Sequence, residues 1–272
     1  MQDYTPTAIK SRLTTNLLGR RIELHPQVGS TNDLVKQAAQ RGEAEGLVIL
    51  AEEQLTGRGR LGRTWVAPPG CCVLCSVLLR PRFSPRQAFY VTIAAAVAIH
   101  RALRGIGGGA LSPAIKWSND VLLDGRKVSG ILSESEFSGG GWAFSVLGFG
   151  INVNLRRDQL GGLRDTATSI SAELGREVDR VEVLARVLGE LEGLYLLLQG
   201  GQFGTVHAEW AGALETLGRR VSIVEPGGGG AGTPVQGKAL RVDADGALVV
   251  LTDSGVQRRV LAGDVSVRDA GL

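Results

Sequence analysis

The apolar positions of this chain repeat with two different periods, and each period predicts its own elements. Apolar residues three and four apart predict helices, whereas short apolar runs between turn residues predict buried strands. Helices are expected at 30–42, where Ser30 opens a capping box, at 84–103, where Ser84-Pro85 form the cap and Gly105 the stop, at 169–174 and at 179–198. Strands are expected at 46–52, 71–79, 114–117 and 142–150, with a hairpin over 121–136 that turns at Asp124-Gly125. The pattern therefore predicts an α+β fold, a mixed sheet with helices.

The pattern changes after Gly218, where short strands replace the helices. They are expected at 221–224, 234–242, 247–251 and 257–261, with turns at 227–230, 245–246 and 253–255. Closely spaced short strands of this kind are typical of a small all-β module. We place the boundary near Thr216, which gives a body over residues 1–215 and a β domain over residues 216–272.

The composition is that of a globular protein, with 43% hydrophobic and 21% charged residues. A net charge of +3 is too small for a general nucleic-acid-binding surface, although a pI of about 8.9 is compatible with an anionic ligand. The longest apolar run, 94–99, is too short to span a bilayer, and residues 1–6 do not resemble a signal peptide. No membrane association is therefore expected.

The cysteines lie together at Cys71, Cys72 and Cys75, in one apolar segment. This grouping is unlike the disulfide framework of a secreted protein, so a reducing cytoplasm is the expected compartment. The pair Cys72-x-x-Cys75 could bind a metal or carry redox chemistry, but its apolar neighbours favour buried structural thiols. The histidines, at 25, 100 and 207, show no metal-ligand spacing, so no metal site is assigned.

Residues 57–65 read Gly-Arg-Gly-Arg-Leu-Gly-Arg-Thr-Trp and combine three arginines with three glycines. Dense positive charge and accessible backbone amides favour an anion such as a polyphosphate. Gly57, Gly59 and Gly62 also match the dinucleotide-binding pattern G-x-G-x-x-G. That pattern must open a helix, however, and Pro68-Pro69-Gly70 prevents one here. The arginines, rather than the glycines, therefore carry the prediction.

Three further segments could carry chemistry. Residues 116–120 read Lys-Trp-Ser-Asn-Asp and residues 126–132 read Arg-Lys-Val-Ser-Gly-Ile-Leu. A lysine among apolar neighbours could fix a carboxylate or phosphate, Gly130 could let a ligand lie on the strand, and Asp120 could support a metal. Residues 148–154, Gly-Phe-Gly-Ile-Asn-Val-Asn, place two amides beyond a strand end. Taken singly, these segments could also be a surface hairpin and a plain turn, and the residue chemistry leaves both interpretations open.

Taken together and in this order, the segments resemble the biotin protein ligases. The family patterns G-R-G-R-x-G-R-x-W, K-W-P-N-D, K-x-x-G-I-L-x-E and G-x-G-I-N-V-N correspond to 57–65, 116–120, 127–134 and 148–154. The family's S-T-N appears as Ser30-Thr31-Asn32, and its glutamine as Gln54. The C-terminal strands resemble the family's SH3-like domain. The resemblance runs from about Arg21 to the end of the chain.

The resemblance implies a catalytic domain like that of class II aminoacyl-tRNA synthetases, followed by a small SH3-like β-barrel. It also implies a two-step reaction. Biotin and ATP, assisted by Mg²⁺, form biotinyl-5′-adenylate and pyrophosphate, and biotin then passes to one lysine of a biotin carboxyl carrier domain. The acceptor protein is not specified by the sequence, and a homodimer stays open beside a monomer.

The resemblance also assigns a role to each matched residue. Contacts with biotin are expected from Ser30, Thr31, Asn32, Gln54, Arg58, Gly59, Arg60, Lys127 and Gly130. Contacts with ATP or the adenylate are expected from Arg58, Arg60, Arg63, Trp65, Asn119, Lys127 and Asn152. Lys127 and Arg60 are expected to be catalytic by neutralising the carboxylate and phosphate that must meet. Asp120 is expected to assist metal binding or deprotonation of the acceptor lysine. The polar, glycine-rich residues 156–167 are expected to form a loop that could fold over the adenylate.

The chain departs from the family pattern in two places. Ser118 replaces the proline of K-W-P-N-D, a change that would loosen the turn but removes no functional group. The 1–29 segment is too short for the helix-turn-helix domain of some family members, so a ligase without DNA binding is expected.

Two other functions stay open at this stage. Lipoate ligases and octanoyltransferases share the fold but do not display the arginine pattern of 57–65. An RNA-binding patch is the other, and it is disfavoured by the single aromatic residue in the loop and the nearly balanced charge.

Overall fold

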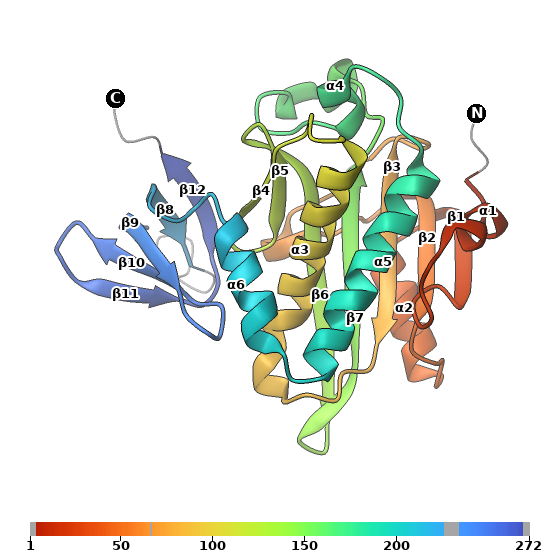
Figure 1. The fold of residues 1–272 in the computed structure, drawn as a ribbon, viewed down its shortest axis with the longest axis horizontal. Helices are drawn as coiled ribbons and strands as arrows, with labels where there is room; N and C mark the ends of the chain where they lie inside the picture. Colours follow the sequence, from red (N-terminus) through yellow and green to blue (C-terminus); the bar gives the residue numbers. More distant parts are fainter. Residues whose placement is uncertain (1–3, 66, 226–233, 269–272) are drawn as a thin grey trace.

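A computed structural model describes residues 4–65, 67–225 and 234–268. In these ranges a seven-stranded mixed sheet runs in the order β1-β2-β3-β7-β6-β5-β4 (Figure 1). Only β1 and β2 are parallel, and every other neighbouring pair in this sheet is antiparallel. The strands are Arg21–Val28 (β1), Leu47–Gln54 (β2), Cys72–Leu79 (β3), Pro113–Lys116 (β4), Asp120–Leu123 (β5), Arg126–Ser138 (β6) and Gly141–Asn152 (β7). The predicted α+β fold is confirmed.

The sheet buries apolar residues on both faces because alternate side chains of each strand point in opposite directions. On β2, Val48 and Leu50 join the main core with α3 and α5, which lie in front of the sheet in Figure 1. Leu47 and Ile49 instead join a smaller cluster with Val35 of α2. The helices are Pro6–Arg12 (α1), Thr31–Gln40 (α2), Phe89–Ile106 (α3), Ile170–Leu174 (α4), Arg180–Gln199 (α5) and Phe203–Ala213 (α6).

The most apolar helix lies at the centre of this core. The helical residues 85–106 are long and apolar enough to pass for a membrane span by length and composition. This helical stretch extends well beyond the uninterrupted apolar run at 94–99 on which the sequence-based expectation rested. Within the fold, 72% of its most apolar window is buried. Its Val91, Ile93 and Leu103 pack in the main core with residues of α5 and the sheet. The burial of a core helix thus accounts for its hydrophobicity.

Several predicted elements need correction. Ser84 caps a short 3₁₀ turn, Pro85–Gln87, and α3 begins only at Phe89 and continues past Gly105. Ser30 occupies the N-cap position of α2 without a side-chain cap hydrogen bond. The expected loop at 156–167 contains the 3₁₀ turns Arg157–Leu163.

No range was predicted for four elements: α1, β1, α6 and the last strand, β12 (Asp264–Arg268). β1 is an edge strand whose exposed and buried positions do not alternate, and Pro26 lies within it. Such a strand lacks the period on which the prediction rested.

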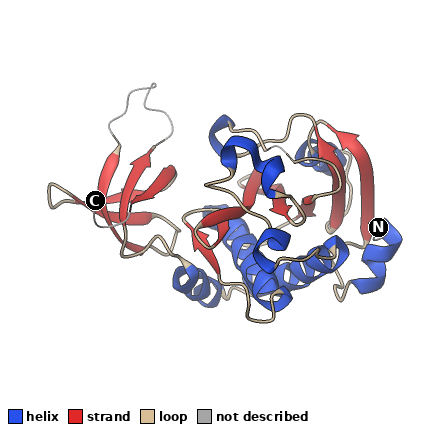
Figure 2. Cartoon of the chain, turned by 90° about the horizontal axis from the view of Figure 1, so that it is seen from above, coloured by secondary structure: helices blue, strands red, loops and turns tan. Residues whose placement is uncertain are grey.

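The C-terminal strands form a separate antiparallel sheet in the order β11-β10-β9-β8-β12, set to one side of the body in Figure 2. Its other strands are Arg220–Val224 (β8), Val235–Val242 (β9), Leu248–Thr252 (β10) and Gln257–Val260 (β11). The predicted turn at 227–230 lies outside the described residues. The division at residue 216 remains a prediction.

One turn of this sheet is held by three side chains of the body. Trp117 Nε1 donates to the Gly246 carbonyl at 2.9 Å, and the Tyr90 hydroxyl donates to the Ala244 carbonyl at 2.7 Å. His207 Nε2 lies 2.9 Å from the Asp243 carbonyl. The C-terminal sheet is therefore anchored beside the segment that contains Trp117.

Candidate functional site

Two adjoining pockets meet at the loop of residues 57–65 and share Arg60, Trp65 and Lys127 in their walls. The first pocket lies between the start of α2, the end of β2, this loop, and strands β6 and β7. Its wall is formed by Ser30, Thr31, Asn32, Gln54, Arg58, Gly59, Arg60, Trp65, Cys75, Asn119, Lys127, Gly130, Ile131, Leu132, Gly148, Phe149 and Gly150. All nine residues that the sequence assigned to biotin lie in this one wall.

The second pocket continues past Lys127 toward the C-terminal sheet. Its wall is formed by Gly59, Arg60, Arg63, Thr64, Trp65, Lys116, Trp117, Asn119, Asp120, Lys127, Gly263 and Val265. The residues that the sequence assigned to the nucleotide thus line one pocket or the other, except for Asn152. Gly263 and Val265 show that the C-terminal domain forms part of this wall.

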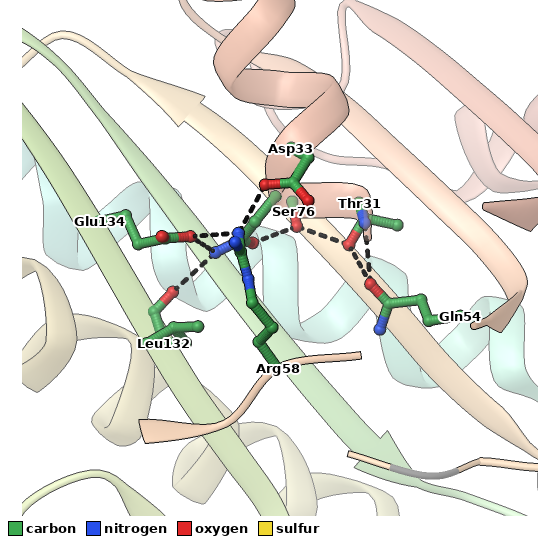
Figure 3. A network of polar contacts seen from close by, with 8 residues as sticks. Thr31, Asp33, Gln54, Arg58, Ser76, Leu132 and Glu134 are labelled. Carbon is green, nitrogen blue, oxygen red and sulfur yellow. Dashed lines mark hydrogen bonds and ion pairs between the residues drawn. The ribbon is translucent and has the colours of Figure 1, made fainter. Parts of the chain in front are cut away.

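A continuous chain of hydrogen bonds runs along the first pocket (Figure 3). Gln54 Oε1 accepts from the backbone N–H of Thr31 at 2.8 Å and from its hydroxyl at 3.1 Å. The Thr31 hydroxyl lies 2.7 Å from the Ser76 hydroxyl, which donates to Asn32 Oδ1 at 2.6 Å. Asn32 Nδ2 donates to Glu134 Oε2 at 2.6 Å. The chain fixes the Gln54 oxygen, and Gln54 lies in the pocket wall, where its amide N–H groups could meet a polar ligand.

The loop of residues 57–65 is a small hairpin, which we call the arginine hairpin. Its stem pairs Gly57 with Trp65, whose N–H donates to the Gly57 carbonyl at 2.9 Å. The Gly59 N–H donates to the Arg63 carbonyl at 2.7 Å, and residues 60–62 form a 3₁₀ tip. Gly57 must be glycine because a Cβ there would lie 2.4 Å from the Trp65 carbonyl oxygen. No helix follows, which confirms that the dinucleotide-binding pattern is coincidental.

Lys127 stands where the two pockets join. Its Nζ lies 2.7 Å from Asp120 Oδ1 and 5.5 Å from the centre of the Trp65 ring. Its backbone is also fixed, because its N–H donates to the Thr166 carbonyl at 2.8 Å and its carbonyl accepts from Thr168 at 2.9 Å. The loop after β7 and the lysine are thus held as one unit.

Two glycines leave a flat, side-chain-free surface on neighbouring strands. Gly130 on β6 pairs with Gly150 on β7, and the Trp65 ring lies over both. A Cβ at Gly150 would come within 2.5 Å of that ring. Two residues away, a Cβ at Gly148 would lie 2.1 Å from Asn32 Oδ1. The glycines are therefore required by close packing on the strand surface.

The segment at residues 116–120 links this surface to the arginine hairpin. Arg60 Nη1 donates to Asn119 Oδ1 at 2.9 Å and also to the Ser118 hydroxyl. Asn119 Nδ2 in turn donates to the Ile131 carbonyl at 2.7 Å. Ser118, the departure from the family's proline, is buried and supplies an additional partner for Arg60.

Asn152 and the cysteines have structural surroundings. Asn152 is buried, and its Nδ2 donates to the Thr168 carbonyl at 2.9 Å, which holds the loop after β7 against the sheet. The three cysteines are free thiols. Burial raises the pKa of Cys72 to about 12 and also raises the pKa of Cys75, so neither thiol ionises readily. The prediction of structural cysteines agrees with this environment.

The structure adds residues to the site that the sequence reasoning missed. Ser76 is the middle of the hydrogen-bond chain, and Asp33 and Glu134 both pair with Arg58. Glu134 ends the quoted pattern K-x-x-G-I-L-x-E, so a signal for it was present. No local signal marks Ser76, because its partners lie on α2, far away in the sequence.

Comparison with known families finds two matches in this chain. Residues 24–152 match the biotin/lipoate A/B protein ligase family. Residues 216–268 match the biotin protein ligase C-terminal domain. The first match covers the arginine hairpin and the strands of the larger sheet that line the two pockets, and the second match covers Gly263 and Val265.

Individual relatives extend over most of the chain. The biotin–[acetyl-CoA-carboxylase] ligase of Mycobacterium tuberculosis is 34% identical over 252 residues, which is 90% of this chain and 88% of that protein. The bifunctional ligase/repressor BirA of Bacillus subtilis is 29% identical over 260 residues, which is 95% of this chain and 78% of that protein. Among solved structures, the biotin protein ligase from Aquifex aeolicus in complex with biotin and ATP superposes with a TM-score of 0.75 at 27% identity. It covers 92% of this chain and 100% of its own.

Proposed function

The chain belongs to the biotin protein ligase family, and on that premise we propose how its residues divide the work of biotin activation and transfer. Its activity is that of a biotin–[acetyl-CoA-carboxylase] ligase. Biotin reacts with ATP to give biotinyl-5′-AMP and pyrophosphate, and the biotinyl group then passes to a lysine of a biotin carboxyl carrier protein. The observation that carries the residue assignment is the single pocket wall formed by all nine residues assigned to biotin.

Biotin recognition rests on the hydrogen-bond chain of the first pocket. The ureido head of biotin has both donors and acceptors, and each one buried without a partner would cost about 1–3 kcal/mol. Such partners come from the Ser30 and Thr31 hydroxyls at the start of α2 and from the Gln54 amide at the end of β2. Gly130 and Gly150 line the same wall, and because the Trp65 ring already lies over both, we propose that biotin lies beside that ring.

Adenylate formation brings together two anions, and the cations between the pockets make this possible. A biotin carboxylate oxygen attacks the α-phosphorus, the new O–P bond forms, and the bond to the β-phosphate breaks to release pyrophosphate. Lys127 and Arg60, which line both pockets, neutralise the charges that must meet. Arg63 in the second pocket faces the remaining phosphates, and Trp65 packs on the adenine ring.

A magnesium ion fits this site only together with the nucleotide. The described residues contain no group of three or more His, Cys, Asp or Glu that could hold a metal by themselves. Mg²⁺ commonly takes one or two carboxylates and completes its shell with substrate phosphates and water. Asp120 is the carboxylate in the second pocket wall, and a metal bound there would neutralise charge on the phosphates and the pyrophosphate leaving group.

In the second step, the acceptor lysine attacks the acyl carbon of the adenylate and AMP leaves. The lysine amine must lose a proton, and Asp120 is the carboxylate that we assign to receive it. The assignment of Asn152 to the nucleotide requires a contact beyond the two pocket walls, because its amide is engaged with Thr168. A cytoplasmic location, the absence of DNA binding and the choice between monomer and homodimer remain predictions.

The test is biotin-dependent exchange between ATP and labelled pyrophosphate by the purified chain. Exchange with biotin and none without it is expected. Thermal unfolding in the presence of ATP with either biotin or lipoate separates the two acids, and the larger stabilisation is expected with biotin. Greater stabilisation by lipoate, or exchange that depends on lipoate, would overturn the assignment of the pocket.

A further inference from the structure

Arg58 in the arginine hairpin is held by two carboxylates that belong to other elements. Its Nη2 lies 2.6 Å from Asp33 Oδ1, in the first turn of α2, and 3.2 Å from Glu134 Oε2, on β6. Figure 3 shows the guanidinium between the two acids. We propose that Asp33 and Glu134 are positioning residues that fasten the arginine hairpin over the biotin pocket through Arg58. We call this three-residue arrangement the Arg58 latch.

The position of the acids supports a positioning role rather than a contact with substrate. Neither Asp33 nor Glu134 lines the two adjoining pockets, whereas Arg58 lines the first. Carboxylates beside a site for a carboxylic acid and a polyphosphate would repel both substrates if they were not neutralised. Arg58 supplies that neutralisation, so part of its charge serves the hairpin and not the phosphate. Arg58 thus anchors the hairpin through ion pairs, beside the hydrogen bonds that Arg60 makes with Ser118 and Asn119.

Glu134 also joins the Arg58 latch to biotin recognition. The Oε2 atom that pairs with Arg58 accepts from Asn32 Nδ2 at 2.6 Å. Asn32 is part of the hydrogen-bond chain that continues through Ser76 to Gln54. The closed hairpin and the ordered biotin wall therefore share one carboxylate oxygen. Loosening the Arg58 latch should weaken retention of the adenylate more than it changes the chemical step.

This inference rests on the proposed function, because it concerns the lifetime of enzyme-bound biotinyl-adenylate. The full-length chain is loaded with biotin and ATP, freed of excess substrate, and followed as labelled adenylate leaves. Partly exposed ion pairs contribute modestly to stability, so Asp33→Asn should shorten the lifetime of the bound adenylate about two- to fivefold. Glu134→Gln should shorten it about fivefold or more, because it affects both Arg58 and Asn32. In Asp33→Asn, exchange at saturating substrate should stay within about twofold of the unchanged chain.

A neighbouring carboxylate provides a matched control. Glu136→Gln makes the same change two residues further along β6, where Gln40 Nε2 donates to the carboxylate at 3.5 Å, away from the arginine hairpin. It should leave the adenylate lifetime unchanged. Trypsin offers a second measurement because it cleaves after arginine. Bound adenylate should protect residues 57–65 in the unchanged chain and in Glu136→Gln, and should protect them less in Asp33→Asn.

A double-mutant cycle separates a positioning role from a merely structural one. In an Arg58→Ala background, Asp33→Asn should shorten the lifetime no further. If Asp33→Asn shortened the adenylate lifetime equally with Arg58 present and in Arg58→Ala, or did not shorten it with Arg58 present, the Arg58 latch would be overturned. A chain that shows no biotin-dependent exchange at all would instead refute the proposed function. If Glu134→Gln failed to fold in a thermal unfolding test, the Asp33→Asn cycle, which changes a partly exposed side chain at the start of α2, would still decide the question.

Discussion

Lys127→Ala should lower the rate of biotin-dependent exchange more when Asp120 is present than when Asp120 is also replaced. Lys127 Nζ and Asp120 Oδ1 are 2.7 Å apart, so the carboxylate stands beside the position from which the lysine acts. Loss of one well-placed electrostatic group at the reacting atoms costs about 10²–10³ in rate. Lys127→Ala should therefore lower the rate of biotin-dependent exchange by about that factor. It also leaves Asp120 as an unneutralised negative charge that faces incoming phosphates.

The size of this second effect follows from the geometry. Two like charges about 5 Å apart repel by about 3 kcal/mol at an effective dielectric constant of about 20. The Asp120 side chain is 20% exposed, and salt screening reduces the repulsion to about 1–2 kcal/mol, which is about tenfold in rate. If Asp120 serves the transfer step and does not hold the metal, the double variant Lys127→Ala, Asp120→Ala should exchange about tenfold faster than Lys127→Ala alone. Removing a second site residue is expected to restore part of the activity.

The assay is initial-rate exchange at several salt concentrations, with Lys36→Ala on the exposed surface of α2 as a lysine control. The advantage of the double variant should shrink as salt rises, because screening removes the repulsion. Exchange by Lys127→Ala at the unchanged rate would refute the role of the lysine. A double variant slower than Lys127→Ala would show that Asp120 contributes to the first step directly, for example by holding the metal.

Four further predictions follow from single contacts. Arg60→Gly removes the contact that we propose between the hairpin and the adenylate phosphate, so activated biotin should escape and label bystander lysines, detectable with avidin on an added indifferent protein. Gly148→Ala places a Cβ 2.1 Å from Asn32 Oδ1 and should raise the KM for biotin about tenfold or more by breaking the hydrogen-bond chain. Ser118→Pro removes one partner of Arg60 and should shorten the adenylate lifetime about two- to fivefold, with an unchanged lifetime contradicting that contact. Burial lowers the pKa of His100, so the unfolded chain takes up the proton more readily and stability falls as the pH drops below about 6.5; His100→Gln should flatten the dependence of Tm on pH between 8 and 5.5.

The sequence was sufficient where structure depends on neighbouring residues. The hairpin turn at Asp124-Gly125 is present, and both residues have positive φ, as the pattern requires. The absence of a helix after the glycines of 57–65 was likewise read from Pro68 and Pro69. Ser169 and Asp179, where two of the expected helices begin, cap those helices with side-chain hydrogen bonds.

The sequence was insufficient where a distant partner decides the outcome. Ser30 has the residue type of a cap, but it faces the first pocket, and the adjacent Thr31 N–H donates to Gln54, twenty-three residues away. Arg58 was assigned to the phosphate because of its charge, and its pairing with Asp33 and Glu134 depends on how α2 and β6 meet the hairpin. Family motifs identify which residues gather at the site. Which role each of several residues of like charge has can be assigned only once its partners in the folded structure are known.

The contacts of Trp117 couple the unfolding of the C-terminal strands to that of the body. The residue is 2% exposed, its backbone N–H donates to Thr216 Oγ1 at 2.9 Å, and its indole N–H donates to Gly246. The next two residues hold Arg60. Separation of the C-terminal strands would expose a tryptophan and release the segment that steadies the arginine hairpin. The body and the C-terminal strands are therefore expected to unfold in one cooperative transition, so ligand retention should be lost over the same temperature range in which both sheets melt.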